Sequence, residues 1–217
     1  SLTNLAVDYV LPDKMHQKVS VVGQPGGLPI GGNSSSRYSQ SQTRLSREML
    51  KVRPATLRDA KQIAELHNAT AQEAFKTMIA EATVPPVQLE KRQAYWREAI
   101  EYAEPQVQVA VDGSKIVGFV GYDRSRDKGT PNTLGEIWDI YVDAAYWGQG
   151  VGLALWDAAR EGLQEEGCTH VSIWVPIAND RAMRFHELAG FKREMSSAKT
   201  VPMGPVKVEE IRLKQPL

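Results

Sequence analysis

The chain has 217 residues, and its 26 basic side chains (Lys and Arg) balance its 26 acidic ones (Asp and Glu). This balance provides no global field that would attract nucleic acid or an anionic membrane, so we expect neither as a partner. No apolar run approaches the ~20 residues that a membrane-spanning helix needs. Cys168 is the single cysteine, which excludes an intrachain disulfide and fits a reducing compartment. The first residues lack the basic and apolar pattern of a signal peptide, so we expect a cytoplasmic protein.

The first 48 residues differ in composition from the rest. Two short extended-looking pieces, Leu5–Leu11 and Lys18–Val22, precede a Gly-rich and then Ser-rich segment that is typical of a linker. We therefore predict an N-terminal extension over residues 1–48 and one domain over residues 49–217. Short apolar strands cannot stabilise themselves, so we expect the extension to lie on the domain or on a neighbouring subunit, as the oligomerisation arm of a homodimer. An incidental extension is the alternative.

The rest of the chain alternates between strand-like and helix-like apolar patterns. Asp112-Gly113 stands between two β-branched runs and predicts a hairpin with a type I′ turn. The predicted elements, in chain order, are a strand (50–53), a helix beginning at residue 54, a looser segment (75–84), a helix (87–102), the hairpin (107–111 with 116–122), a polar loop (124–133), a strand and a helix that ends near residue 167, a strand (170–175), a helix (179–190) and two closing strands (191–195 and 206–213).

The stretch from Gly135 to Leu155 predicts a strand, a glycine-rich turn and the start of a helix. Its strand has β-branched and aromatic residues on both faces, as expected where helices cover a sheet on either side. Gly148, Gly150 and Gly152 then remove three Cβ atoms where the helical pattern begins. Such a turn presents bare amides at the positive end of a helix dipole, and this arrangement favours a pyrophosphate.

Two familiar phosphate-binding motifs do not fit this turn. A P-loop ends in Gly-Lys-Ser/Thr, and no lysine lies between Asp143 and Arg160. A Rossmann fingerprint requires a third glycine where Leu153 stands. A pyrophosphate held mainly by backbone amides remains, with an ordinary strand-to-helix turn as the structural alternative.

On these residues the turn resembles motif A of the GCN5-related N-acetyltransferases. The core of that motif reads Gln/Arg-x-x-Gly-x-Gly/Ala and holds the pyrophosphate of coenzyme A. Gly150 and Gly152 match the core, and Gly148-Gln149 is typical of the same turn. Trp147 departs from the family, which has arginine or glutamine there. The departure affects only a side-chain contribution, because a backbone cradle survives it.

A second segment also resembles this family. The residues from Asn179 to Phe191 are similar to its Asn-x-x-Ala-x-x-Phe-Tyr-x-x-x-Gly-Phe signature, and they follow the expected strand. The resemblance covers about residues 50–214. It implies an α/β fold in which a mixed, mostly antiparallel twisted sheet is flanked by helices on both faces, the acyl-CoA N-acyltransferase fold.

The family implies acetyl-CoA as co-substrate and no metal. Asn179 has a plain structural role as a helix N-cap, and the family implies that it also binds the cofactor. His170 and Cys168 give too few ligands for a zinc site. The residues that the resemblance implies for cofactor binding are Ile140, Tyr141, Val142, Trp147, Gly148, Gln149, Gly150, Val151, Gly152 and Asn179.

Direct attack of an amine on a thioester needs a base for the ammonium and an acid for the leaving thiolate. We predict Glu136 as the base, because apolar neighbours would raise its pKa; a solvated carboxylate at the strand edge is the alternative. Asp139 is a weaker rival, since it lies on the other face of a regular strand, although a bulge would change that parity. The family's acid, a tyrosine, corresponds to His186, with Tyr141 and Tyr146 as substitutes.

The acceptor is the least determined feature. Specificity is expected from residues 70–103 and from the loop at 124–133, where acidic and basic side chains are nearly balanced. We predict N-acetylation of a primary amine that is a small molecule or an amino acid. A protein N-terminus or lysine is the alternative acceptor, and a domain that binds acyl-CoA without turnover is an alternative of another class.

Overall fold

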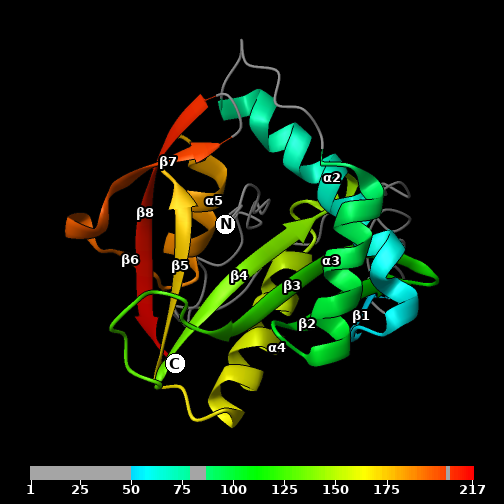
Figure 1. Ribbon diagram of the computed structural model, residues 1–217, viewed down its shortest axis with the longest axis horizontal. Coiled ribbons are helices and arrows are strands. Elements are labelled where there is room, and N and C mark those ends of the chain that lie inside the picture. The colour runs from blue at the N-terminus through cyan, green and yellow to red at the C-terminus, as the bar shows by residue number, and fades with distance from the viewer. Residues whose placement is uncertain (1–49, 79–86, 204–205) are drawn as a thin grey trace, which may run out of the picture.

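The computed structural model describes residues 50–78, 87–203 and 206–217 (Figure 1). The predicted extension at 1–48 lies outside the described residues. Its separation from the domain and its place in a homodimer therefore stay predictions. Among the described residues, no helix is both long and apolar enough to span a membrane.

The described strands form one mixed sheet that is antiparallel except between β4 and β5. Strand β7 pairs with β8 outside the main path. In spatial order the strands are β1 (Leu50–Pro54), β2 (Gln106–Asp112), β3 (Lys115–Arg124), β4 (Leu134–Val142), β5 (His170–Pro176), β8 (Val206–Pro216) and β6 (Lys192–Arg193), with β7 spanning Lys199–Met203.

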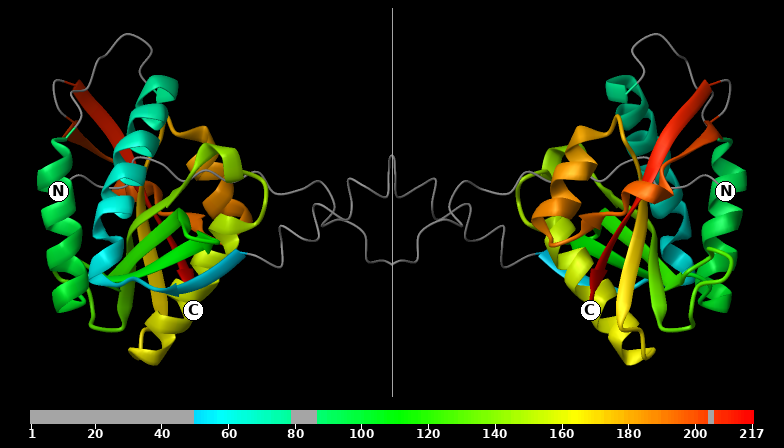
Figure 2. Two further views of the ribbon diagram at one scale, coloured as in Figure 1. Left: turned by 90° about the vertical axis from the view of Figure 1, so that its right-hand side faces the viewer. Right: turned by 90° about the vertical axis from the view of Figure 1, so that its left-hand side faces the viewer.

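Helices cover both faces of this sheet, as the resemblance implied (Figure 2). On one side lie α2 (Ala60–Met78) and α3 (Leu89–Tyr102), which we call the α2/α3 face. On the other lie α4 (Val151–Glu165) and α5 (Asp180–Leu188), the α4/α5 face. Strands β3 and β4 contribute side chains to the apolar cores on both faces, which explains their nearly continuous apolar sequences.

Local sequence accounts for most element boundaries. Thr56 and Asp59 form a capping box before α2, and Arg53 donates to the Asp59 carboxylate at 2.8 and 3.0 Å. Asn179 caps α5, because its Oδ1 accepts a hydrogen bond from the amide of Ala182 at 3.1 Å. The helix predicted to begin at residue 54 begins later in the structure, with a 3-10 turn at Leu57–Asp59 and α2 from Ala60, whereas the predicted cap at Asn179 is confirmed.

Three local predictions need correction. The hairpin forms, but its two-residue loop is Gly113-Ser114, and of the two only Gly113 has positive φ (60°), which fits a type II′ rather than a type I′ turn. The predicted strand at 191–195 is reduced to β6, because a 3-10 turn begins at Met195. Residues 75–78, predicted as loose, continue α2, while residues 79–84 lie outside the described part.

Candidate active site

The sheet opens between β4 and β5. Their parallel pairing covers only Leu134–Glu136 against His170–Ser172, although β4 continues to pair with β3 as far as Val142. Figure 1 shows the two strands diverging toward the end of β4. Beyond Glu136 the β5-facing backbone of β4 is therefore not used by the β4–β5 ladder of the described chain. A ligand with its own amides can hydrogen-bond there as an additional strand does.

The glycine turn lies at the open end of β4. Gly148 and Gly150 have φ values of 72° and 88°, a region in which a Cβ is strained. Gly150 is the N-cap of α4, and Gly152 is buried in the first turn of that helix. The predicted strand, turn and helix are all present, and they place several amides at the N-terminus of a 15-residue helix.

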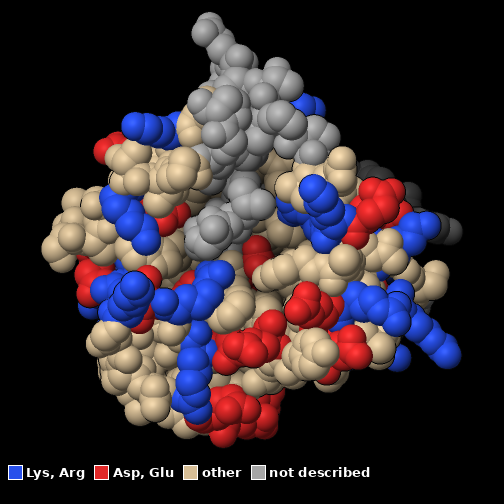
Figure 3. All heavy atoms as spheres, viewed as in Figure 1, with Lys and Arg blue, Asp and Glu red and all other residues tan. Residues whose placement is uncertain are grey.

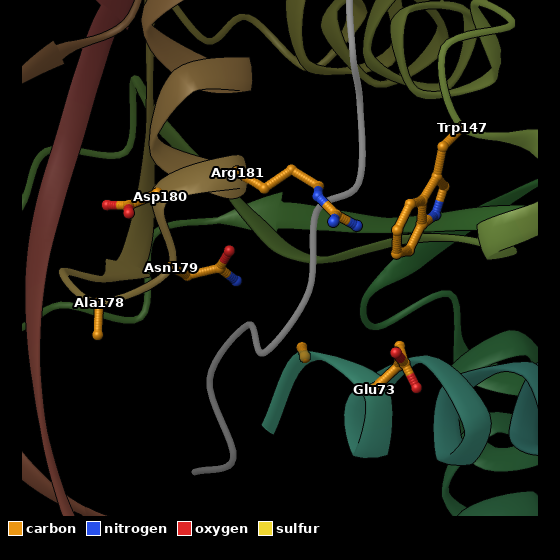
Figure 4. A pocket seen from close by; sticks show the side chains of 7 residues that line it. Glu73, Trp147, Ala178, Asn179, Asp180 and Arg181 are labelled. Carbon is orange, nitrogen blue, oxygen red and sulfur yellow. The ribbon is translucent and has the colours of Figure 1, made fainter. Parts of the chain in front are cut away.

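A cavity of about 280 Å³ lies beside this turn (Figure 4). Three separate parts of the chain line it: α2, the residue before the glycines, and the start of α5. Arg181 reaches toward Trp147, and its guanidinium lies 3.7 Å from the centroid of the indole ring. Trp147 stands where the motif that the sequence resembles has arginine or glutamine, and Arg181 brings a positive charge to the same place. The lining residues are Glu73, Ala74, Trp147, Ala178, Asn179, Asp180 and Arg181.

The structure brings the predicted cofactor residues together at this end of β4. Trp147 and Asn179 line the cavity, and the segment from Gly148 to Gly152 adjoins Trp147 along the turn. The side chain of Gln149 donates to the carbonyl of Ala145 at 2.8 Å and so braces the turn. Ile140, Tyr141 and Val142 are each 1 % exposed, with side chains packed into the two cores. Their backbone is what they can offer a ligand at the sheet opening.

A β-bulge changes the parity of β4. The register pairs Glu136 with Asp123 and Asp139 with Gly121, so Trp138 is an extra residue on β4. Because Asp123 and Gly121 are two residues apart, Glu136 and Asp139 point to the same side of the sheet. That side is the α2/α3 face, since Gly121 lies against Trp96 of α3. The two carboxylates are neighbours, not occupants of opposite faces.

Glu136, the predicted base, forms an ion pair with Arg126. It is 1 % exposed, and its carboxylate accepts from the backbone amide of Arg126 at 2.9 Å and from Nε at 3.1 Å. Nη2 of Arg126 makes a further, shorter contact with the same carboxylate. The two guanidinium nitrogens share Oε1 while the backbone amide donates to Oε2, so charge-assisted hydrogen bonds engage both carboxylate oxygens of Glu136.

Asp139 has the properties that Glu136 lacks. It is 5 % exposed, and its Oδ1 has no hydrogen-bond partner within the described residues. Burial raises the pKa of Asp139 to about 7, an effect that the charges of Arg126 and Arg92 oppose and that of Glu136 reinforces. A carboxyl group that titrates near neutral pH is suited to exchange a proton with an amine.

The loop at 124–133 is anchored on both sides of the sheet opening. Arg126 binds Glu136 on β4, while the carboxylate of Asp127 accepts from the indole of Trp174 on β5 at 3.1 Å and from Arg212 on β8 at 2.8 Å. The loop thus bridges the two strands near the point where their pairing ends. Its predicted contribution to acceptor specificity stays a prediction.

Sequence reasoning missed two buried polar residues on the α2/α3 face. His67 on α2 accepts from the indole of Trp96 at 3.2 Å, and its ring lies 4.4 Å from that of Tyr141. Burial, with the nearby charge of Arg92, lowers the pKa of His67 well below its usual value, so the ring is neutral. Arg92 on α3 is 8 % exposed. Its spacing of four residues before Trp96, on the apolar face of the helix, is the signal that would have identified it.

His186, predicted as the acid, is on the opposite side of the sheet. It is 2 % exposed, and its ring packs edge-on against Phe185 (4.9 Å) and Phe191 (5.2 Å). Neither ring nitrogen has a partner in the described part of the chain, and burial lowers the pKa of His186 to about 3. A neutral, enclosed imidazole has no proton to donate near pH 7. The substitute Tyr146 donates its hydroxyl to Asp112 at 2.9 Å, so it too is engaged elsewhere.

Comparisons with known proteins address the identity of this fold. A family model described as "Acetyltransferase (GNAT) family" matches residues 65–191, more than half of the chain. Mycothiol acetyltransferase of Propionibacterium freudenreichii is 29 % identical over 99 residues, which are 46 % of this chain and 31 % of that protein. An uncharacterized N-acetyltransferase of Methanocaldococcus jannaschii is 33 % identical over 81 residues, 37 % of this chain and 36 % of that one. The chain thus spans about a third of the length of these relatives.

Solved structures share the fold at lower identity. Ribosomal-protein-alanine N-acetyltransferase from Brucella melitensis superimposes with a TM-score of 0.62 at 20 % identity, covering 77 % of this chain and 99 % of that one. The protein yncA from Salmonella typhimurium, solved with its cofactor acetyl-CoA, gives 0.59 at 19 % identity over 78 % and 94 %. The mixed, mostly antiparallel sheet with helices on both faces is therefore the acetyltransferase fold that the two sequence motifs implied.

Proposed function

Because the chain belongs to the acetyltransferase (GNAT) family and is an acyltransferase, we propose that it transfers the acetyl group of acetyl-CoA to a small primary amine. One observation carries the proposal. Strand β4 has an open backbone edge beyond Glu136 on its β5 side, and it carries the buried, partly unpartnered carboxyl of Asp139 on its α2/α3 face. A thioester held along that edge would lie beside a group that can take a proton from the amine.

We assign acetyl-CoA to the open edge, the glycine turn and the adjoining cavity. In this assignment the amides of Gly148–Gly152 would hold the pyrophosphate, and the backbone of Ile140–Val142 would hold the amides of the pantetheine arm. Asn179 and the Arg181–Trp147 pair line the cavity between these elements and α2. No group of His, Cys, Asp and Glu that would hold a metal occurs among the described residues.

We assign the base to Asp139 in place of Glu136. Asp139 accepts a proton from the ammonium of the acceptor, and the free amine then attacks the thioester carbonyl. The C–N bond forms as the C–S bond breaks, the nitrogen releases its second proton to water, and the departing thiolate takes a proton from water. Glu136 positions Arg126, and its negative charge helps to keep the pKa of Asp139 high. His186 has no role in this proposal because its ring is enclosed among phenylalanines.

The depth of Asp139 favours a small acceptor. At 5 % exposure its carboxyl is reached by a narrow primary amine more readily than by a side chain or terminus that is attached to a folded protein. A protein acceptor is the alternative that the same experiment addresses.

The test combines binding with turnover. A ligand that binds only the folded state at ~100 times its dissociation constant adds roughly 2.7 kcal/mol of stability. We expect acetyl-CoA and CoA to raise the melting temperature and ATP, which lacks the pantetheine arm, to leave it unchanged. Thiol release from acetyl-CoA is then measured with small amines and with peptides that offer an N-terminus or a lysine. Saturable release with a small amine supports the proposal, whereas release with peptides alone, or no stabilisation by either CoA species, overturns it.

A further inference from the structure

We infer that the acceptor amine also carries a carboxylate, and that Arg92 binds this carboxylate beside Asp139. The inference rests on the proposed function, since it concerns the acceptor of the same site. Arg92 lies on the face of α3 that packs against the sheet, together with Trp96 and Ala99. Asp139 projects from β4 toward that same helix layer. The two charged groups therefore border one region.

The orientation of Arg92 is fixed by its neighbours on the helix. Trp96, one turn later, packs edge-on against Phe119 with ring centroids 4.9 Å apart and donates its indole N–H to His67. These contacts hold the buried face of α3 against β3 and α2, so Arg92 is directed into the protein. Burial lowers the pKa of the Arg92 guanidinium, and the carboxyl of Asp139 opposes this shift, as fits a guanidinium close to the C-terminal half of β4.

Arg92 has unused binding capacity. Its guanidinium carries five N–H donors, and Nη1 is buried with no hydrogen-bond partner in the described residues. Leaving a buried charged donor unsatisfied costs more than leaving a neutral one, and a carboxylate is the anion that matches a guanidinium fork. Oδ1 of Asp139 is the corresponding unpartnered acceptor. An ammonium and a carboxylate on one small molecule satisfy both atoms.

The balance of charge favours one carboxylate over a phosphate. Arg126 is paired with Glu136, and His67 is neutral because burial lowers its pKa, as fits an Nδ1 that accepts from Trp96. On α3 and β4 the charges of Arg92 and Asp139 are thus left to face the acceptor, while the buried carboxyl of Glu210 on β8 has the ammonium of Lys199 3.4 Å away. Figure 3 shows the same mixture on the surface, with acidic atoms in the middle of this face and basic ones on both sides.

The carboxylate also has a consequence during the reaction. When Asp139 takes a proton from the ammonium, it loses its negative charge, and Arg92 loses a nearby counter-charge. A carboxylate on the acceptor keeps Arg92 paired through the transfer, whereas a simple amine leaves it buried and uncompensated. We therefore expect an amino acid to be preferred over the amine that differs from it only by the missing carboxylate.

The experiment uses matched acceptors in the thiol-release assay. The pairs are alanine with ethylamine, γ-aminobutyrate with propylamine, and phenylalanine with phenethylamine; phosphoethanolamine replaces the carboxylate by a phosphate ester. For at least one pair we expect the carboxylate to lower the KM by about 10- to 100-fold. In Arg92→Gln this ratio falls toward one, and in Arg92→Lys part of it returns. Arg97→Gln removes an exposed arginine from the same helix and keeps the ratio.

The outcomes separate this inference from the proposed function. Turnover of amines with no preference for the carboxylate, a preference unchanged in Arg92→Gln, or a preference for phosphoethanolamine overturns the inference and leaves the acetyltransferase proposal intact. If no amine releases thiol, the proposed acetyltransferase function is wrong, and the carboxylate site is then tested by binding alone. With CoA present, the amino acids should then raise the melting temperature of the wild type and not that of Arg92→Gln. No rise in the wild type overturns the inference.

Discussion

The two faces of strand β4 differ in the kinds of groups that surround them. The α4/α5 face is an apolar core beside a glycine turn, and the cofactor contacts that we propose beyond it come largely from backbone amides. The α2/α3 face buries charged and polar side chains from several elements, among them His67 on α2, Arg92 on α3, and Glu136 and Asp139 on β4. In the proposed site, binding of the pyrophosphate depends on the local shape of the backbone. Binding and deprotonation of the amine depend instead on side chains that tertiary packing brings together.

The largest expected effect is the loss of the carboxylate on Asp139. We expect Asp139→Asn to lower kcat/KM by about 100-fold or more, because general base catalysis contributes at least that much. The stabilisation by acetyl-CoA should persist, since it depends on the other side of β4. Asp157→Asn, in which an exposed carboxylate of α4 is removed, is the matched control and should keep full activity. If Asp139→Asn retains activity within a few-fold of the wild type, the chemistry does not belong to the α2/α3 face as we assign it.

The second prediction concerns pH. Asp139 is active when deprotonated, and burial raises its pKa to about 7, so kcat/KM should rise with pH through neutrality and level off above it. Because the negative charge of Glu136 contributes to this raised pKa, Glu136→Gln should move the midpoint of the profile to lower pH. In this variant Arg126 also loses its negatively charged partner, and its positive charge lowers the pKa of Asp139 further. Glu161→Gln, at an exposed position of α4, should leave the midpoint in place. A midpoint that stays or rises in Glu136→Gln contradicts the coupling between the two carboxyls.

The third prediction tests the glycine turn, whose backbone amides we assign to the pyrophosphate. Gly150→Ala places a Cβ at φ 88°, which should cost about 1–2 kcal/mol of stability and distort the turn that we assign to the pyrophosphate. We expect a raised KM for acetyl-CoA with little change in the pH midpoint. Gly129→Ala is a close control, because Gly129 has φ 78° with open space around its Cβ position and lies in the polar loop. Equal changes in the acetyl-CoA KM for the two variants would show that strain in general, and not the shape of this turn, is responsible.

The same difference between the two faces of β4 explains which parts of the site could be predicted from the sequence. Local structure depends on residues that act close to their own position in the chain, such as the glycines at 148, 150 and 152 and the N-cap at Asn179. Their spacing therefore predicts the fold and the turn between β4 and α4 that we assign to the pyrophosphate. Asp139 was ranked below Glu136 because a regular strand separates them, and the bulge at Trp138 is what brings them to one face. Arg92 and His67 meet β4 only through the packing of α3 and α2; the position of Arg92 one turn before Trp96 marks it as facing inward, but no local pattern shows which strand it meets.

The smallest expected effect belongs to His186, and it tests the side of the sheet that we regard as passive. By its match to the family signature this residue would be the acid, and its replacement would then reduce turnover severely. Its ring is instead packed between Phe185 and Phe191, and burial holds its pKa near 3. We therefore expect His186→Leu, which keeps a similar volume without the two unpartnered nitrogens, to retain kcat within about two-fold and to be at least as stable as the wild type. Thermal melts and thiol release measure both quantities. A loss of kcat comparable with that of Asp139→Asn, in a variant that melts normally, would return the acid to α5 and would mean that both faces of β4 take part in proton transfer.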